Sequence, residues 1–185
     1  FSSPPHIHNI TYRGIVIEGG LHNDDPSATK MWMGPGSYGS QPAGEDHITT
    51  AQPGAGAVSF LEIMEGPYLV KPSSEAFAAE RFPVNIHSSN LIWLGSQEVD
   101  WIDKTDIGPK ISFLWGSPAS GNPFGSLVKL PAGYHGNVST FDDARLILIQ
   151  GELVYQSRNL KPGSFIRAMG NVTHRFECLS INCQI

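Results

Sequence analysis

The chain contains an internal repeat, and no other feature of the sequence constrains its fold as strongly. Residues 13–19 (RGIVIEG) are similar to residues 145–151 (RLILIQG), at a constant offset of 132 residues between Arg13 and Arg145. Each segment is an apolar run that ends at a glycine, which is the pattern of a strand running into a tight turn. Such a repeat predicts two copies of one structural unit.

The similarity continues beyond this strand. Gly36 lies eleven residues before His47, and Gly163 lies eleven residues before His174. The segment between the repeated elements is five residues shorter in the second copy, a difference that a surface loop accommodates. Both halves have the order strand, glycine turn, loop, Pro-Gly-Ser, strand and histidine, so we predict a duplicated domain.

The remaining strand signals predict an all-β fold. Short apolar runs recur with glycine or proline between them, as in sandwiches and barrels, and no long segment has the 3.6-residue period of a helix. The 20 glycines and 14 prolines suit tight turns, and the polar segment 22–27 is predicted to be a loop. The predicted strands are 11–20, 58–64, 91–94, 111–115, 126–130, 146–149 and 164–168, with a last strand that ends at Ile185.

The domain boundary is predicted near the middle of the chain. Residues 66–85 contain three prolines, and the stretch 75–81 is predicted to form one or two helical turns. We therefore expect a first domain at 1–72, a linker at 73–88 and a second domain at 89–185.

Composition excludes several classes of function. The net charge of −5 and the pI near 5.7 argue against a nucleic-acid partner, because such a partner needs a basic face. The sequence has no apolar stretch of about 18–20 residues that could cross a membrane, so we expect a soluble protein, cytoplasmic or periplasmic. Cys178 and Cys183 are five residues apart; one bridge is possible, but two structural thiols are favoured.

Two motifs in the first half resemble those of the cupin superfamily. Gly36, Pro42, Gly44 and His47 match the second cupin motif, G-x5-P-x-G-x2-H-x3-N, except that Ala51 stands in the place of Asn. The first motif, G-x5-H-x-H-x(3,4)-E-x6-G, is matched from the pair at positions 6 and 8 through to the glycines at 19 and 20.

The first motif departs from the family at its acidic ligand. Its glutamate position falls on Tyr12 or on Arg13, depending on which glycine closes the motif. Neither residue simply replaces a carboxylate, so Tyr12 is predicted to be a packed aromatic residue with its hydroxyl near the pocket. For Arg13 a structural salt bridge is the first expectation, because Arg145 repeats it in the other half.

The resemblance covers essentially the whole chain and is greatest to an uncharacterised bacterial bicupin family. It implies an all-β fold of two tandem cupin domains, each a double-stranded β-helix, or jelly roll. A cupin normally has one or two strands before the first motif, and only five residues precede His6. We therefore expect a first domain that lacks its N-terminal strands, further sequence upstream, and a homodimer that covers or exchanges the open sheet edges.

The spacing of three histidines predicts a metal site. Residues i and i+2 of a strand face the same side, so His6 and His8 point the same way. His47, on a neighbouring strand after a Pro-x-Gly turn, would complete three imidazole ligands. Neutral imidazole suits Fe, Zn, Ni and Cu, and three protein ligands leave open positions for water or substrate. We expect one divalent ion, Fe(II) or Zn(II); His22 and His87 have no companion and are predicted to be surface or loop residues.

The second half does not repeat the site. Counted from Gly133, the two histidine positions fall on Ser139 and Phe141; counted by the offset of 132, they fall on Val138 and Thr140. His174 remains, with His135 near it in sequence. Other ligand and turn positions of the motifs hold Ala144, Met169 and Asn171. We therefore predict a degenerate cupin domain without a metal.

The function expected from the resemblance is a metal-dependent enzyme that acts on a small organic substrate. Some three-histidine cupins are dioxygenases that cleave β-diketones or oxidise thiols, so an Fe(II) dioxygenase-type reaction is favoured. Tyr12 and Arg13 are the candidate catalytic residues, which would place an anionic substrate. The alternatives are a non-catalytic zinc-binding sensor or ligand-binding cupin, and a metal-dependent isomerase or hydrolase.

Overall fold

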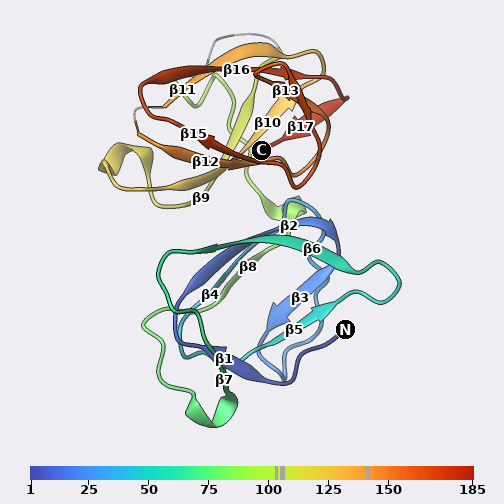
Figure 1. The fold of residues 1–185 in the computed structure, drawn as a ribbon, viewed down its shortest axis with the longest axis vertical. Coiled ribbons are helices and arrows are strands. Elements are labelled where there is room, and N and C mark those ends of the chain that lie inside the picture. Colours follow the sequence, from blue (N-terminus) through green and yellow to red (C-terminus); the bar gives the residue numbers. More distant parts are fainter. Residues whose placement is uncertain (103, 105–106, 141) are drawn as a thin grey trace. The chain divides into compact units, whose positions relative to one another are not determined.

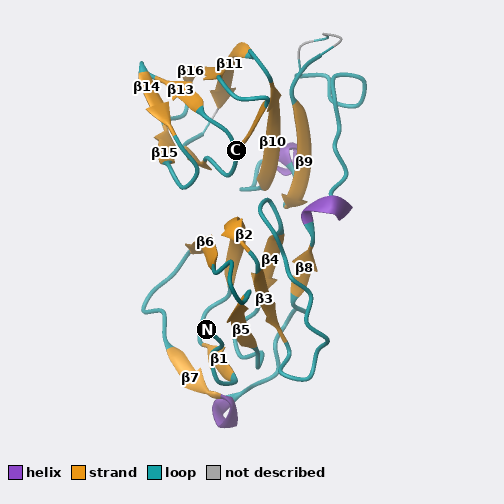
Figure 2. Cartoon of the chain, turned by 90° about the vertical axis from the view of Figure 1, so that its right-hand side faces the viewer, coloured by secondary structure: helices purple, strands orange, loops and turns teal. Residues whose placement is uncertain are grey.

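A computed structural model of the chain describes residues 1–102, 104, 107–140 and 142–185. The described residues form two compact units, Phe1–Asn90 and Leu91–Ile185. Short antiparallel strands joined by turns make up both units (Figure 1, Figure 2). The predicted all-β fold is confirmed. No helix in the described part of the chain is long and apolar enough to cross a membrane.

The first unit is built on a four-stranded antiparallel sheet with the order β6-β2-β4-β8. Two strand pairs, β1-β7 and β3-β5, accompany this sheet, and a bridge between His6 and His47 joins them. The elements are β1 (His6–His8), β2 (Tyr12–Gly19), β3 (Leu21–Asp24), β4 (Tyr38–Gln41), β5 (Ile48–Ala51), β6 (Ala57–Ile63), β7 (Val70–Pro72), η1 (Ser73–Glu75), β8 (Val84–Ile86) and η2 (Ser88–Asn90).

The second unit contains three sheets, with the orders β17-β10-β9, β11-β16-β13-β14 and β12-β15. Its elements are β9 (Lys110–Trp115), η3 (Pro118–Ser120), β10 (Gly125–Pro131), β11 (His135–Thr140), β12 (Ala144–Ile147), β13 (Leu153–Tyr155), β14 (Arg158–Leu160), β15 (Phe165–Ala168), β16 (Val172–Cys178) and β17 (Asn182–Gln184).

The register of the strand pairs repeats between the two units. In the first unit β2 pairs with β4 so that Ile15 lies opposite Tyr38. In the second unit β12 pairs with β15 so that Ile147 lies opposite Phe165. The first members differ by 132 residues and the second members by 127, which is the offset of the sequence repeat with its five-residue deletion.

The same offsets relate a second set of strand pairs. β3 pairs with β5 with Leu21 opposite Ala51, and β13 pairs with β16 with Leu153 opposite Cys178. A glycine with positive φ stands just before each of these sets: Gly19, at the end of β2, with a φ of +71°, and Gly151, between β12 and β13, with a φ of +88°. A Cβ at either position would collide with a carbonyl oxygen, so the repeated glycine meets the same steric requirement twice.

Three sequence-based assignments need correction. The predicted loop at 22–27 begins inside β3, because its residues pair with β5 despite their polarity. The predicted strand at 91–94 is reduced to a single bridge between Leu94 and Ile111. The predicted helical turns at 75–81 are one 3-10 turn that ends at Glu75.

The segment 73–88, predicted to be a linker, lies within the first unit. Its strand β8 pairs with β4, with Tyr38 opposite Ile86. An edge strand of three residues carries too short a pattern to be recognised in the sequence, and its prolines and polar neighbours favoured a linker instead.

The core of the second unit lies against a disulfide. Leu148, Leu153 and Phe176 are almost fully buried in the same apolar cluster as the two cysteines. The turn between β16 and β17 brings the Cα atoms of Cys178 and Cys183 to 5.8 Å, and the sulfurs are bonded. The prediction of two free structural thiols was therefore wrong, because their spacing alone did not reveal the turn.

Candidate metal centre

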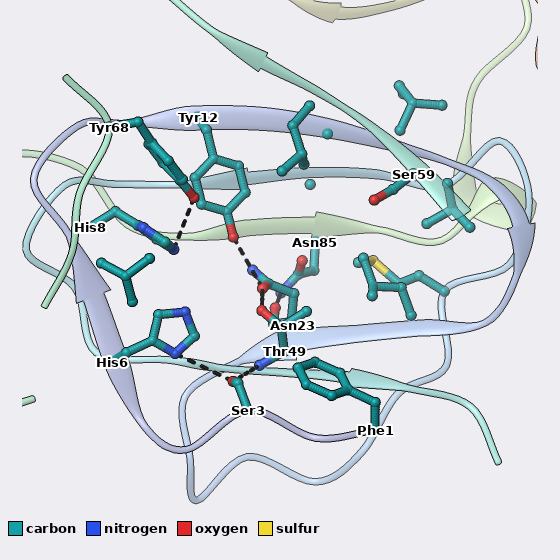
Figure 3. A pocket seen from close by; sticks show the side chains of 18 residues that line it. Phe1, Ser3, His6, His8, Tyr12, Asn23, Thr49, Ser59, Tyr68 and Asn85 are labelled. Atoms are coloured by element: carbon teal, nitrogen blue, oxygen red, sulfur yellow. Dashed lines mark hydrogen bonds between the residues drawn. The ribbon is translucent and has the colours of Figure 1, made fainter. Parts of the chain in front are cut away.

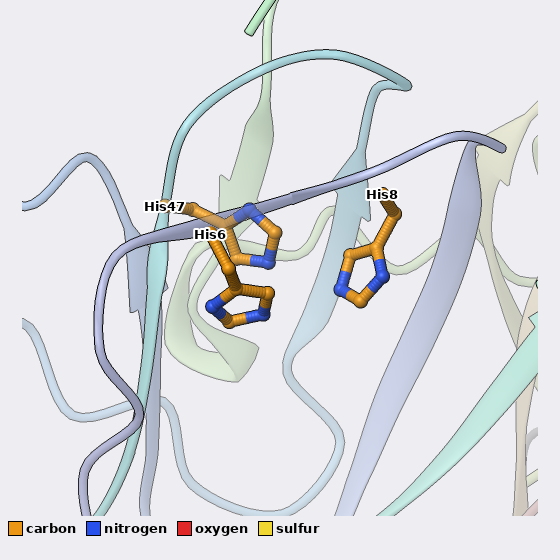
Figure 4. Close-up of side chains that lie close together, drawn as sticks. All are labelled: His6, His8 and His47. Carbon is orange, nitrogen blue, oxygen red and sulfur yellow. The ribbon is translucent and has the colours of Figure 1, made fainter. Parts of the chain in front are cut away.

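The structure brings the three predicted histidines together. His6 and His8 lie two residues apart on β1 and point toward the same region, while His47 immediately precedes β5 and pairs with His6 across the strands (Figure 4). One ligand nitrogen from each ring lies within 4.8 Å of the others. This cluster could hold a metal ion.

Hydrogen bonds determine which nitrogen of each ring is available. In all three histidines Nδ1 lies within hydrogen-bond distance of a main-chain carbonyl oxygen, so Nδ1–H donates and Nε2 keeps its lone pair. These bonds join His6 to Pro4 at 2.9 Å, His8 to Leu69 at 3.3 Å and His47 to Glu45 at 3.1 Å.

Burial keeps two of the imidazoles in the neutral form. The exposed fractions of His8 and His47 are 4% and 0%, and burial is the main cause that lowers the pKa of each to about 4. The neighbouring histidines lower both pKa values further. His6 is half-buried. Neutral imidazoles that carry an unprotonated Nε2 fit Fe(II), Zn(II) and related divalent ions.

Tyr68 lies directly against this cluster, and the sequence did not reveal it. Its ring stacks on that of His8 with centroids 4.4 Å apart and planes 15° apart, and its hydroxyl donates to His8 Nε2 at 3.0 Å. Burial raises the pKa of Tyr68 well above its usual value, so the hydroxyl stays protonated. Tyr68 comes from the segment between β6 and β7, where no motif or periodicity indicates a ligand-facing residue.

Tyr12 points into the same region from β2. Its hydroxyl donates to Asn23 Oδ1 at 3.1 Å and lies 3.5 Å from His47 Nε2. Burial raises the pKa of Tyr12 to about 12. A neutral phenol therefore occupies one of the two places where the motif would put a carboxylate ligand.

Arg13 does not line the cavity beside the histidines. Its guanidinium lies 3.6 Å from the Glu62 carboxylate on the paired strand β6. Successive residues of a strand face opposite sides, so Tyr12 and Arg13 cannot both face the cavity on a regular strand. The structural salt bridge expected for Arg13 is found, and the alternative expectation, that Arg13 places a substrate, has no support in this geometry.

His6 and His8 line one end of a cavity of about 300 Å³, and His47 clusters with these two histidines. Figure 3 shows His6, His8 and Tyr68 on one side of it and Asn23, Thr49 and Asn85 beside them. Asn23 Oδ1 accepts hydrogen bonds from the Tyr12 and Thr49 hydroxyls, at 3.1 and 2.6 Å. Sequence reasoning missed Asn23 because it was assigned to a loop, whereas the strand β3 turns its side chain inward.

His22 lies beside Asn23 on β3 but is not part of the site. Its exposed fraction is 1%, and Nδ1 accepts a hydrogen bond from the Met31 N–H at 3.3 Å. The prediction of a surface or loop residue was therefore wrong for His22, since the strand places it inside. His87 is half-buried in the segment between β8 and η2.

The second unit keeps the strand register of the site without its ligands. Val138 lies opposite His174 as His6 lies opposite His47, so the count by 132 residues is the one that places Val138 and Thr140 at the histidine positions. His174 Nδ1 accepts from the Tyr155 hydroxyl at 2.8 Å, and Nε2–H donates to the Met169 carbonyl at 3.1 Å. Both nitrogens of His174 are engaged.

Solved structures with a similar fold include a quercetin 2,3-dioxygenase and a vicilin. A protein from Nostoc punctiforme with a provisional assignment as a dioxygenase is 14% identical, with a TM-score of 0.68, and the match covers 100% of this chain and 63% of that chain. Quercetin 2,3-dioxygenase from Acinetobacter baumannii is 12% identical, with a TM-score of 0.56, and the match covers 100% of this chain and 65% of that chain. Vicilin from Corylus avellana is 11% identical, with a TM-score of 0.58, and the match covers 99% of this chain and 69% of that chain.

These similarities establish the fold, which is the cupin jelly roll predicted from the motifs. The chain spans 60–65% of the length of the first three solved structures that it matches. No curated protein matches the chain. A family match does extend over residues 1–182. The chain therefore belongs to DUF4437, a family described as a domain of unknown function.

Proposed function

We propose that the chain is a two-domain cupin whose first unit is the metal centre of a dioxygenase-type enzyme, with Fe(II), acting on a small organic substrate. One observation carries this proposal: one ligand nitrogen from each of three histidines lies within 4.8 Å of the others, and two of these histidines, His6 and His8, line a cavity large enough for a small molecule. The names of two similar structures, which refer to dioxygenases, agree with it.

His6, His8 and His47 would hold the ion, and Fe(II) bound there would supply a redox-active centre that can react with dioxygen. The protein supplies the surroundings. Carbonyl groups hold each ring in the tautomer that presents Nε2, and Tyr68 keeps a proton on its hydroxyl beside His8. Tyr12 is anchored by Asn23, so its oxygen stays fixed next to His47.

The alternatives differ in what they require of the cavity. Isomerase or hydrolase chemistry normally needs a general base, and a carboxylate is a common one. Among the described residues that line the cavity, none is Asp or Glu. A zinc-binding sensor or ligand-binding module needs only the three histidines and a binding cavity, so it is the second candidate.

The test is metal content by mass spectrometry on the full chain, beside His47→Ala and the matched control His174→Ala. His174 stands at the equivalent register position of the second unit. Near-stoichiometric iron that is lost only in His47→Ala, together with oxygen uptake on a panel of diketones and thiols, would support the enzyme. Zinc with no turnover would favour the sensor, and no metal after reconstitution would overturn both.

A further inference from the structure

The side chains that line the cavity of the first unit change from polar to apolar along β2. Tyr12 lies at the histidine end, while Ile15 and Val16 line the cavity three and four residues farther along the strand. Both can line it because the pairing of β2 with β6 becomes irregular at this point, with a register shift between Val16 and Glu18. At about 3.3 Å per residue this places them roughly 10–13 Å from Tyr12. Val16 pairs with Ser59, and Figure 3 shows Ser59 on the side of the cavity away from His8.

The far end of the cavity is apolar. Leu21 lies two residues from Asn23 on β3, so both side chains face the cavity, and Leu21 is bridged to the buried Met33. Together with Ile15 and Val16 these residues form an apolar end, which we define as Ile15, Val16, Leu21 and Met33. This end can receive a hydrocarbon group by excluding water from it.

The cavity offers no partner for a charged group outside the histidine end. Among the described residues that line it, none is Asp, Glu, Lys or Arg. The amide of Asn23 is already engaged, because Nδ2 donates to Gln41 Oε1 at 3.2 Å and Oδ1 accepts two hydroxyls. A carboxylate or ammonium held there would lose its hydration without a compensating ion pair.

At the histidine end, by contrast, a ligand should carry a hydrogen-bond acceptor. The Tyr68 hydroxyl donates to His8 Nε2, which is the lone pair that an ion would take. Once that lone pair is used, the hydroxyl of the half-buried Tyr68 needs another acceptor. An oxygen of the ligand beside the ion would supply this acceptor.

We propose that this cavity takes a ligand with an oxygen-donor end and an uncharged, hydrocarbon-rich body. The donor end faces His6, His8 and Tyr68, and the body occupies the apolar end. The inference rests on the proposed function, and it narrows the substrate class to small molecules that carry no carboxylate, phosphate or ammonium on the body. A volume of about 300 Å³ is at the lower end for ligand cavities.

The test uses two probes that differ only at the tail. Hexanohydroxamic acid and adipic acid monohydroxamate share an oxygen-donor head and a six-carbon chain, but the second ends in a carboxylate. Both are titrated by calorimetry into the full chain loaded with zinc, which avoids redox chemistry, and zinc content is measured after each titration. We expect the hydrocarbon tail to bind at least about tenfold more tightly, a difference of about 1.4 kcal/mol.

A pair of variants assigns the preference to the apolar end. Ser59 is half-buried, lines the cavity and pairs with Val16, so Ser59→Lys should reverse or abolish the preference by offering a cation to the carboxylate. Val58 is the adjacent residue of β6, is 49% exposed and does not line the cavity. The matched control Val58→Lys should leave the preference unchanged.

Three outcomes would overturn the inference, and they are distinguishable. Equal affinities for the two probes, with zinc retained, would remove the inference and leave the proposed metal site intact. Ser59→Lys and Val58→Lys variants that behave alike would show that the tail lies elsewhere. If the full chain takes up no zinc, so that its zinc content equals that of His47→Ala, both the proposed function and the inference are overturned.

Discussion

Main-chain carbonyl groups decide which histidine nitrogens are free, and this separates the two units at the scale of single residues. His47 donates from Nδ1 to the Glu45 carbonyl, whereas His174 donates from Nε2 to the Met169 carbonyl and receives the Tyr155 hydroxyl at Nδ1. The two histidines occupy the same register position. The Nε2 lone pair is therefore available in His47, whereas in His174 the Nδ1 lone pair already accepts a hydrogen bond from Tyr155.

Removing the Tyr68 hydroxyl should tighten metal binding. The hydroxyl must give up its bond to His8 Nε2 before an ion can bind there, and such a bond is worth about 1 kcal/mol. In Tyr68→Phe the ring stacking stays, and we expect an increase of about fivefold in zinc affinity, measured by competition with a chelator.

The matched control for this variant is Tyr155→Phe, which removes a hydroxyl from a histidine in the second unit. It should leave zinc affinity unchanged. A tenfold loss of affinity in Tyr68→Phe would contradict the prediction, because it would mean that the phenol oxygen contributes to holding the ion.

The metal-free protein should lose stability between pH 6.5 and pH 4. The folded chain lowers the pKa of His8 and His47 from 6.5 to about 4, chiefly by burial. Below pH 6.5 the unfolded chain therefore binds more protons than the folded chain, and the free energy of unfolding falls until the pH reaches the folded pKa values. We expect a loss on the order of 3 kcal/mol from each of the two histidines.

Urea unfolding of chelator-treated protein at a series of pH values measures this loss. Acidic groups also titrate at low pH, so the comparison is with His47→Gln, which lacks one of the two buried imidazoles. The variant should show a shallower fall over the same interval. Parallel curves for the two proteins would contradict a role for these histidines.

At this scale the sequence predicted the three clustered histidines but not the residues that surround them. His6, His8 and His47 were identifiable because strand alternation and the Pro-x-Gly turn place them by spacing alone. Tyr68 reaches the site from an irregular segment, and no local pattern specifies the path of such a segment. Asn23 was missed because its polar neighbours resemble a loop.

At the scale of elements, one asparagine ties the Tyr68 segment to the end of β1. Asn9 Nδ2 donates to the Pro67 carbonyl at 2.9 Å, and Asn9 Oδ1 accepts from the Leu69 N–H at 2.7 Å. The Leu69 carbonyl in turn receives His8 Nδ1–H. The orientation of a ligand ring therefore depends on a clamp one residue away from it.

Asn9→Ala should release this segment. Hydrogen exchange of the amides around Leu69 should become faster by about tenfold or more, since two side-chain hydrogen bonds are lost at about 1 kcal/mol each. Zinc affinity should fall severalfold because His8 is less firmly held. Asn159→Ala, at an exposed position of β14, is the control, and unchanged exchange around Leu69 in Asn9→Ala would contradict the clamp.

The strands that could be predicted are those with long apolar runs. β2, β6, β9 and β10 were located because their residues are mostly apolar and end near glycine or proline. β4 (YGSQ) and β11 (HGNVST) are polar or glycine-containing, and they become strands only because partners pair with them. Tertiary pairing outweighs local preference in such strands.

At the scale of the whole molecule, the repeated strand register could be predicted from the sequence because two segments kept both their order and their offset. The domain limits could not be, because the short strand β8 extends the first unit past the predicted boundary. A sequence repeat identifies equivalent positions in the two units, but the last strand of a sheet is known only from the strand that it pairs with, as β8 pairs with β4.

We expect a homodimer. The four-stranded sheet of the first unit has the three-residue strand β8 at one edge, and a sheet edge favours pairing with another chain. Light scattering on purified protein should give a mass about twice the 20.1 kDa of one chain. A single-chain mass at all concentrations tested would contradict this prediction.

The shared register makes the second unit a template for engineering. Val138 and position 140 of β11 stand where the first unit has two ligands, and His174 stands opposite Val138. The turn before His174 also persists, since Asn171 keeps the positive φ of Gly44, 59° against 81°. Histidines introduced at positions 138 and 140, with Tyr155→Asn to release His174, would test whether the equivalent positions of the second unit can also hold a metal ion. The shared register therefore offers a design site where a second histidine cluster can be compared, within one polypeptide, with that of the first unit.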